Sequence, residues 1–226
     1  MRTIFRFFFS IYGFLVFLAL MLLLLPLFIF SFLRGEVKGG NILFKICRFW
    51  ADVFFWLIAI RHKNIYEAEH DRYKQYIFIS NHISYLDIPM MMKAVRRQHI
   101  RILGKAEMAK IPIFGFIYKQ GAVLVNRKST NHRMKSVKDL VYFLNKKISV
   151  FICPEGTFNV THQPLKSFYD GAFRIAIETQ MPIRPILFLD TYDRLNYKNI
   201  FSLNPGICRA VYLPEIKTSG LTLRDI

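Results

Sequence analysis

Apolar residues fill a long stretch near the start of the chain, from Phe7 to Leu33, with no charged residue in its 27 positions. As a helix this stretch would measure about 40 Å, more than the roughly 30 Å hydrocarbon core of a bilayer. A signal peptide would share the basic start at Arg2 and Arg6, but its apolar part is shorter, and no small-residue cleavage site follows here. The pattern therefore predicts a retained membrane anchor with a kink at Pro26.

A second apolar stretch, residues 41–60, carries polar residues at intervals of four, three and four, at Asn41, Lys45, Arg48 and Asp52. This spacing places them in one stripe along a helix, which would lie either in the membrane interface or in a protein core. Two tryptophans and a broad apolar face favour the interface. Residues 1–60 are thus predicted to form two membrane-associated helices, and residues 61–226 a separate domain. The distribution of Lys and Arg around the first helix favours the cytoplasmic side for that domain.

Short β-rich runs alternate with helical periodicity through residues 61–226. The predicted strands are 76–80, 122–125, 150–153, 186–189 and 207–213, and the predicted helices are 129–147 and 171–179. This alternation is typical of an α/β domain with a mostly parallel central sheet flanked by helices. Residues 221–225 read like a helix start at which the sequence stops, which suggests that a terminal helix is missing.

Composition narrows the class of protein further. Hydrophobic residues make up 53% of the 226 residues, too many for a disordered chain. Cys47, Cys153 and Cys208 form no C-x-x-C pair, so we expect neither a disulfide framework nor a thiolate zinc site. The net charge of +17 predicts an anionic partner: phospholipid headgroups, a phosphorylated substrate or nucleic acid. Nucleic acid is disfavoured, because the sequence shows no basic run with interleaved aromatic residues beyond 96–101.

The first candidate for chemistry is Asn81-His82-Ile83-Ser84-Tyr85-Leu86-Asp87, which follows the predicted strand 76–80. Ligands bind at the carboxyl ends of strands in α/β sheets. A bent loop can return Asp87 to the imidazole of His82, fix its tautomer and leave the other ring nitrogen as a base. The pattern alone is equally compatible with Asp87 as a helix cap and His82 as an ordinary loop residue.

Two more elements place polar residues after predicted strands. Glu155 in Pro154-Glu155-Gly156-Thr157 would accept hydrogen bonds from substrate hydroxyls, unless this segment is an ordinary polar turn. Arg127 follows the strand 122–125, and Lys105 lies upstream in Gly104-Lys105-Ala106-Glu107. Either cation would suit a phosphate, and the alternative is that both are solvated surface charges. His, Asp and Cys residues show no ligand spacing that indicates a metal.

In this order the elements resemble the motifs of the 1-acylglycerol-3-phosphate acyltransferase (lysophosphatidate acyltransferase) family, over about Tyr76 to Leu213. The segment from Asn81 to Asp87 resembles its catalytic motif, and residues 121–127 resemble its phosphate-binding motif. Residues 154–157 resemble the third motif, and residues 182–186 the fourth, an apolar strand near the acyl site. The chain departs from the family at Phe158-Asn159, where many members carry Arg-Ser, at Arg184, which replaces an apolar residue, and at Asn126, where an acidic residue is common. These departures bear on the choice of acceptor and acyl chain rather than on the reaction.

The resemblance implies an enzyme, an O-acyltransferase of phospholipid biosynthesis. It would move a fatty acyl group from acyl-CoA or acyl carrier protein to the sn-2 hydroxyl of 1-acylglycerol-3-phosphate, giving phosphatidic acid. His82 would act as general base oriented by Asp87, and the substrate would be bound by Glu155, Gly156, Thr157, Arg127 and Lys105, with no cofactor and no metal. The expected partners are the membrane phospholipid surface, the lysophosphatidate acceptor and the acyl donor, at the inner (cytoplasmic) membrane. The alternatives are another acceptor, such as glycerol-3-phosphate, another lysophospholipid or an amino-lipid, and a non-enzymatic, basic, membrane-anchored binding protein.

Overall fold

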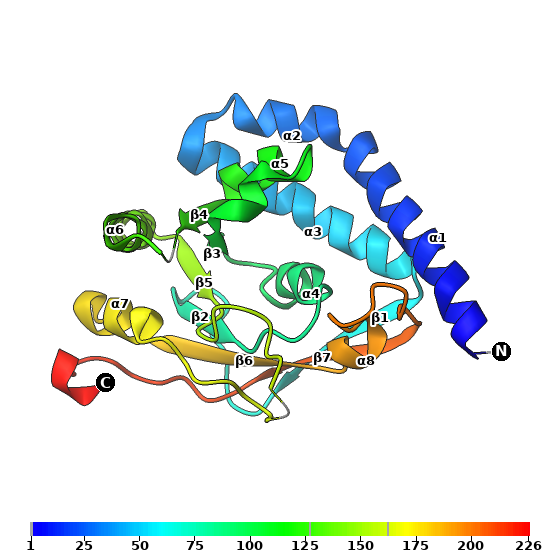
Figure 1. The fold of residues 1–226 in the computed structure, drawn as a ribbon. Helices are drawn as coiled ribbons and strands as arrows, with labels where there is room; N and C mark the ends of the chain where they lie inside the picture. Colours follow the sequence, from blue (N-terminus) through cyan, green and yellow to red (C-terminus); the bar gives the residue numbers. More distant parts are fainter. Residues whose placement is uncertain (1, 127, 162) are drawn as a thin grey trace.

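The computed structural model describes residues 2–126, 128–161 and 163–226. Within these ranges seven strands form one sheet in the order β1-β7-β6-β2-β5-β3-β4 (Figure 1). The strands are β1 (Ile60–Tyr66), β2 (Ile77–Ser80), β3 (Ile100–Lys105), β4 (Ala122–Val125), β5 (Ser149–Ile152), β6 (Ile183–Leu189) and β7 (Gly206–Tyr212). β2 to β6 are parallel to one another, whereas β7 runs antiparallel to β6 and parallel to β1. The predicted α/β fold with a mostly parallel sheet is confirmed.

The ends of the strands lie along two opposite sides of the sheet, which we call edges, and different strands end at each of them. The carboxyl ends of β2, β5, β3 and β4 meet at one edge, which we call the His82 edge. β1 and β7 run the opposite way, so they end at Tyr66 and Tyr212 on the other side, which we call the Tyr212 edge. The residues that the sequence places after strands 76–80, 122–125 and 150–153 therefore gather at the His82 edge.

Helices cover the sheet on both faces, and each face has its own core (Figure 1). On one face α3 (Gly40–Leu57) and α4 (Asp87–Ala94) pack over aromatic side chains such as Phe78 and Phe151. On the other face α6 (Thr130–Asn145) and α7 (Gly171–Thr179) pack over aliphatic ones such as Ile77. The two cores differ because successive residues of β2 point to opposite faces of the sheet. Apart from the two helices at the start of the chain, the other helical segments are the π-helix η1 (Gly35–Gly39), the 3₁₀ helices η2 (Ala106–Lys110) and η3 (Leu223–Asp225), and the α-helices α5 (Phe114–Gly121) and α8 (Thr191–Arg194).

The chain begins with α1 (Arg2–Leu23), followed after Leu24 by α2 (Leu25–Phe32). Pro26 lies in the first turn of α2 and has no N–H to continue the helix, so α1 and α2 meet at an angle above α3 (Figure 1). Among the described residues one helix, Thr3–Leu23, is long and apolar enough to cross a membrane, with a mean hydropathy of 2.1. Most of its side chains are not buried in the protein, which suggests membrane association.

The helix α3 differs from our prediction. We expected its apolar face to lie in lipid, but much of that face is buried in the core, including Phe44 and Phe55, whereas Phe49 and Trp56 are exposed. The polar stripe also contacts protein at Asp52, whose carboxylate pairs with Lys93 at 2.5 Å and with Arg96 at 2.6 Å beside α4. The sequence shows that one face of this helix is apolar, but it does not show that the sheet and α4 pack against it. The division of the chain at residue 60 stays a prediction.

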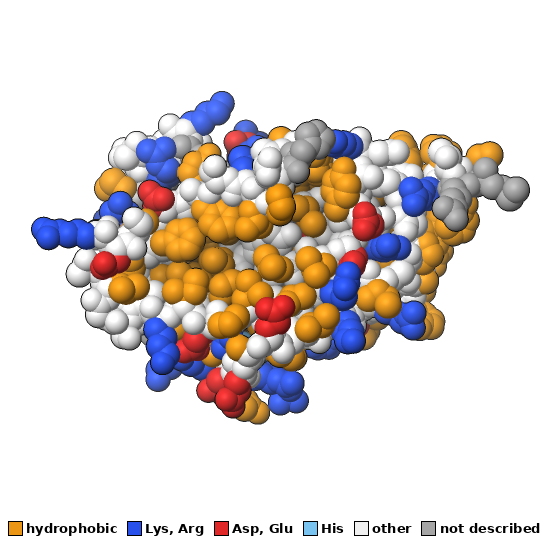
Figure 2. All heavy atoms as spheres, turned by 90° about the horizontal axis from the view of Figure 1, so that it is seen from below, with side chains coloured by type: hydrophobic (Ala, Val, Ile, Leu, Met, Phe, Trp, Pro, Cys, Tyr) orange, Lys and Arg blue, Asp and Glu red, His pale blue; other side chains and the backbone are white. Residues whose placement is uncertain are grey.

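The face of the molecule on the side away from α3 carries an apolar area that is surrounded by charged side chains (Figure 2). The helix α7 packs over Ile183 at the amino end of β6. Farther along this side of the sheet, Leu187 and Leu189 of β6 are half-buried and Ile207 of β7 is exposed. This part of the sheet is therefore less covered than the part beneath α3 and α4.

Candidate active site

The loop after β2 leaves from the middle of the sheet and is tied to the strands on both sides. The side-chain amide of Asn81 donates to the carbonyl of Phe188 in β6 at 3.0 Å and accepts the N–H of the same residue at 2.8 Å. The N–H of His82 donates to Glu155 Oε1 at 3.1 Å, and its carbonyl accepts the N–H of Asn159 at 2.8 Å. These bonds fix the backbone of His82 between β6 and the turn after β5.

The imidazole of His82 contacts the carboxylate of Asp87, as the sequence predicted. Nδ1 lies 2.9 Å from Oδ2; the carboxylate is fully buried, whereas the imidazole is 22% exposed. Oδ2 also accepts the N–H groups of Ile83 at 2.7 Å and Ser84 at 2.8 Å, and Oδ1 accepts the hydroxyl of Thr191 at 2.8 Å. With Nδ1–H directed at a carboxylate, Nε2 presents its lone pair.

The alternative role of Asp87 as a helix cap is also decided by these contacts. Asp87 is the first residue of α4, where the helix dipole stabilises negative charge by about 0.3–1 kcal/mol. Its oxygens nevertheless bond to loop amides that precede the helix rather than to the amides of the first turn. The carboxylate therefore holds the loop and the imidazole together instead of capping α4.

Glu155 is the second buried carboxylate at this edge. Besides the N–H of His82 on Oε1, it accepts the N–H of Lys166 on Oε2 at 3.1 Å. Burial raises the pKa of Glu155, and the two backbone N–H groups partly offset that rise. Both oxygens thus face protein amides. The contact with substrate hydroxyls stays a prediction, and the observed bonds favour a role in bracing the loops.

The rest of this turn is more open. Gly156 has a φ of +76°, a left-handed conformation that favours glycine, and its N–H donates to the carbonyl of Cys153 at 3.0 Å. Thr157 is exposed, and its hydroxyl accepts a hydrogen bond from Lys166 Nζ at 3.0 Å. Lys166 is a cation at this edge that the sequence analysis did not select.

Of the two predicted phosphate ligands, Lys105 lies within the described residues. Lys105 is the exposed last residue of β3, which pairs with β5. At about 4.8 Å per strand, β3 is roughly 10 Å from β2, so Lys105 belongs to the same edge without adjoining His82. Arg127 lies outside the described residues; β4, which precedes it, ends at Val125 on the far side of β3.

A group of aromatic side chains adjoins the His82–Asp87 pair. The ring of Phe158 lies 4.4 Å from that of His82, and the rings of Tyr85 and Tyr197 lie 5.0 and 5.8 Å from Phe158. Phe158 is one of the positions at which the sequence departs from the family pattern described above. Its ring provides an apolar surface beside the imidazole.

Comparison with known proteins identifies the family to which these residues belong. The family model described as Acyltransferase matches residues 60–189, more than half of the chain. The chain belongs to the acyltransferase family. The matched residues run from β1 to the end of β6 and include His82, Asp87 and Glu155.

Relatives of this chain come from animals and bacteria. The chain is 31% identical over 153 residues to 1-acyl-sn-glycerol-3-phosphate acyltransferase alpha of Mus musculus, covering 67% of this chain and 53% of that protein. It is 30% identical over 194 residues to the alpha enzyme of Homo sapiens, covering 84% and 67%. It is 29% identical over 154 residues to the 1-acyl-sn-glycerol-3-phosphate acyltransferase of Salmonella typhimurium, covering 67% and 61%. The chain thus spans about half the length of the mouse relative.

A solved structure shares the fold of this chain. The crystal structure of the 1-acyl-sn-glycerophosphate (LPA) acyltransferase, PlsC, from Thermotoga maritima matches with a TM-score of 0.77 at 20% identity, covering 100% of this chain and 90% of that one. At this identity the likeness concerns the fold alone. It extends over the amino-terminal helices as well as the sheet.

Several residues of the site have no signal in the sequence. Thr191 bonds to Asp87 across 104 residues, and Tyr197 reaches Phe158 from the segment after α8. No periodicity or motif links these positions to His82. Within the described residues, His, Cys, Asp and Glu side chains form no group of three or more suited to a metal ion.

Proposed function

We propose that this protein is a membrane-associated enzyme that moves a fatty acyl group from acyl-CoA or acyl carrier protein to the sn-2 hydroxyl of 1-acylglycerol-3-phosphate, giving phosphatidic acid. The observation that carries the proposal is the His82–Asp87 pair at the carboxyl edge of a parallel sheet, in a chain of the acyltransferase family. The names of the mammalian and bacterial relatives support the choice of acceptor.

The reaction requires an alcohol to attack a thioester near neutral pH. In our scheme Nε2 of His82 removes the proton of the acceptor hydroxyl while Asp87 stabilises the imidazolium through Nδ1. The hydroxyl oxygen bonds to the acyl carbonyl carbon, whose C–S bond then breaks. The departing thiolate takes the proton from Nε2, which regenerates the neutral imidazole. Backbone N–H groups near Gly156 or at the start of α4 are the proposed donors to the oxyanion, although the N–H of Gly156 itself is bonded to Cys153.

The acceptor would be held by cations at the His82 edge. We assign its phosphate to Arg127 and Lys105, joined by Lys166 beside Thr157. Glu155 and Gly156 would shape the turn on which this group rests. The apolar helix α1 would keep the protein at the membrane that contains the lysophosphatidate acceptor, with the sheet domain on the cytoplasmic side.

The surroundings of Phe158 favour a second acceptor class, a lysophospholipid or amino-lipid with a different headgroup. The aromatic rings around His82 provide no positive charge at a position where many family members carry arginine. Incubation with a mixed pool of lysolipids and acyl donors, followed by mass spectrometry of the products, distinguishes the two acceptors. Phosphatidate as the main product would support lysophosphatidate as the acceptor. A different main product would identify a different acceptor.

The role of His82 is tested by substitution. Purified His82→Ala protein should lose at least about two orders of magnitude in acyl transfer to lysophosphatidate, the usual scale of general-base catalysis. His132→Ala, at an exposed position of α6, is the matched control and should keep wild-type activity. Full activity in the His82 variant would falsify the assignment.

A further inference from the structure

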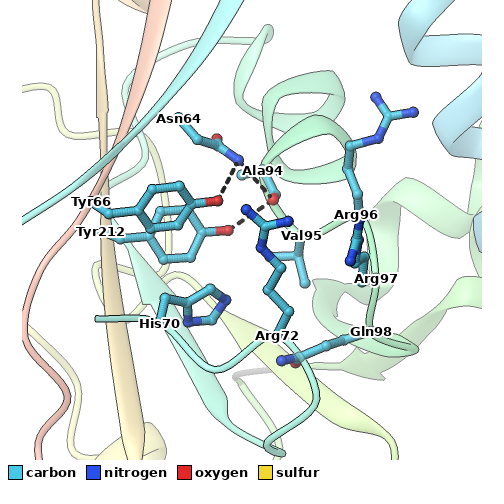
Figure 3. Close-up of a pocket in the computed structure, with 10 residues that line it drawn as sticks. All are labelled: Asn64, Tyr66, His70, Arg72, Ala94, Val95, Arg96, Arg97, Gln98 and Tyr212. Atoms are coloured by element: carbon cyan, nitrogen blue, oxygen red, sulfur yellow. Dashed lines mark hydrogen bonds between the residues drawn. The ribbon is translucent and has the colours of Figure 1, made fainter. Parts of the chain in front are cut away.

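The Tyr212 edge contains a pocket of about 410 Å³ that the proposed reaction does not use. Tyr66 and Tyr212 form one wall at the ends of β1 and β7, and His70 lies next to them (Figure 3). Arg72 extends across the pocket, and residues 94–98, at the end of α4 and beyond, form the opposite wall (Figure 3). The pocket therefore brings together four separate segments of the chain.

This pocket is distinct from the candidate active site. α4 begins at Asp87 and ends at Ala94, and a helix of this length measures about 12 Å. The catalytic pair adjoins its amino end, whereas the pocket adjoins its carboxyl end. Lys105 and the segment before Arg127 lie at the His82 edge, so the pocket is also separate from the proposed site for the acceptor phosphate.

The pocket has an excess of positive charge. Arg72, Arg96 and Arg97 line it, and Arg96 is neutralised by both oxygens of Asp52. Arg72 and Arg97 are exposed and, among the described residues, have neither a hydrogen bond nor an ion pair. Burial, together with nearby Arg184 and Arg72, lowers the pKa of His70 to about 4, which is consistent with a positive potential here.

Neutral groups of the pocket offer further hydrogen bonds. Tyr66 accepts a hydrogen bond from Asn64 at 3.2 Å and keeps its own hydroxyl hydrogen for another acceptor. Nδ1 of His70 is buried with no partner in the described part of the chain. The carbonyl of Ala94 at the end of α4 is bonded to Tyr212 at 2.8 Å and Asn64 at 3.3 Å, which reduces its repulsion of an anion.

An adjoining hollow of about 470 Å³ shares Tyr66, His70 and Arg72 with the pocket and adds Glu67 and Glu69. Carboxylates would repel a second phosphate but accept hydrogen bonds from hydroxyl groups. The combined site thus offers guanidinium groups on one side and hydroxyl acceptors on the other. Its volume suits a small organic molecule rather than an ion alone.

We propose that the pocket at the Tyr212 edge binds the phosphate ester of a hydroxylated molecule, with Arg72 and Arg97 on the phosphate and Glu67 and Glu69 near its hydroxyl groups. Arginine is suited to this because its planar guanidinium donates two parallel hydrogen bonds to phosphate oxygens. Such an ester could be a soluble metabolite or a lipid headgroup, and the experiment below separates the two.

The soluble source is tested by calorimetric titration of the full-length protein with glycerol 3-phosphate at constant ionic strength. Arg72→Gln/Arg97→Gln should weaken binding at the pocket about tenfold or more, as expected for loss of two charge-assisted contacts. Arg61→Gln/Arg224→Gln removes the same charge at exposed positions elsewhere and should bind like the wild type. Lys105→Gln alters the His82 edge and should leave the pocket binding unchanged.

The lipid source is tested by thermal unfolding of the same variants in phosphatidylcholine nanodiscs that contain either phosphatidylglycerol, whose headgroup carries hydroxyl groups, or phosphatidylserine, which has the same net charge. Stabilisation by phosphatidylglycerol that only the Arg72/Arg97 variant loses would identify a lipid headgroup as the ligand. Loss of titration binding in that variant alone would identify a soluble ester.

Three outcomes overturn the proposal: no saturable binding in either arm, equal loss in both double variants, or a loss confined to Lys105→Gln. Because the side chains of Arg72 and Arg97 have no hydrogen bond or ion pair within the described part of the chain, their replacement should not lower the unfolding temperature without ligand, and this is measured first. Neither arm measures acyl transfer, so the result is independent of the proposed function.

Discussion

The turns after β2 and after β5 each bury a carboxylate at the same edge of the sheet, but they use it differently. Asp87 receives two loop amides, the Thr191 hydroxyl and the His82 imidazole. Glu155 receives backbone amides alone, one from His82 and one from Lys166. One carboxylate acts on a side chain that reaches solvent, and the other acts on the backbone that carries this side chain.

This difference shows that similar sequence signals need not indicate similar roles. Both acids lie in segments that follow a short apolar strand, and both were predicted site residues. Asp87 was expected to orient His82, and Glu155 to accept hydrogen bonds from substrate hydroxyls. The number and kind of their donors separate them. A carboxylate that bonds an imidazole can orient a base, whereas one that bonds amides from two loops fixes the distance between those loops. Variants of the two residues should therefore affect different measurements.

The largest effect is expected for Asp87→Asn. The amide cannot stabilise the imidazolium or select the productive tautomer as a carboxylate does, so kcat should fall by about 10²–10⁴-fold. The rate is measured per folded protein, with the folded fraction taken from circular dichroism. Thr191→Val removes one donor from Oδ1 and leaves the bond to His82, so its kcat should fall by about tenfold or less. Equal losses in both variants would mean that the pair acts through the position of the loop alone.

A smaller and different effect is expected for Glu155→Gln. The new NH₂ group would face a backbone N–H, so one hydrogen bond is lost and the free energy of unfolding should fall by about 1–3 kcal/mol. Urea unfolding measures this change, and Glu178→Gln at an exposed position of α7 should change the same quantity by less than about 0.5 kcal/mol. If kcat fell as far as in Asp87→Asn at unchanged stability, Glu155 would instead contact the substrate, as the sequence analysis expected.

The smallest effect concerns pH. Because burial raises the pKa of Glu155 in the folded protein above its ordinary value of 4.5, the folded state takes up this proton at a higher pH than the unfolded state. The contribution of Glu155 to stability is therefore largest below about pH 4.5 and is lost as the pH rises through the folded-state pKa. The stability of the wild type relative to Glu155→Gln should increase on acidification, by no more than about 1.4 kcal/mol per pH unit. Urea unfolding across this range measures the difference, and the opposite slope would contradict the assigned direction.

Strands were predicted correctly where the chain is mostly apolar, and two strands that contain more polar or charged residues were missed. The predicted strands at 122–125 and 207–213 correspond closely to β4 and β7. β1 was missed because polar residues occupy most of its length. β3 was missed because it includes Arg101, whose buried guanidinium donates to the backbone carbonyls of Glu36 and Val37 at 3.1 and 3.0 Å. Such partners are distant in sequence, so composition cannot reveal that this charge is buried.

The same rule applies to the candidate site. His82 and Asp87 are five residues apart, and the contact between them could be predicted because a single loop closes it. In the sequence, Phe158 is distinguished only as a departure from a family pattern. Its position against His82 depends on how two loops meet. Arg184 was expected near the acyl site, yet its side chain bonds to the carbonyls of Leu213 and Glu69, toward the amino end of β6. Local geometry was accessible from sequence, and contacts between loops were not.

The bond between Asp87 and Thr191 also has a consequence for biosynthesis. The ribosome must add 104 residues after Asp87 before this partner exists, which takes roughly 5–20 s at about 5–20 residues per second. β6, which pairs with β2 and holds Asn81, is completed only shortly before Thr191. During this interval α1 has already left the ribosomal tunnel. A newly made chain should therefore reach the lipid bilayer while the loop from Asn81 to Asp87 is still unformed.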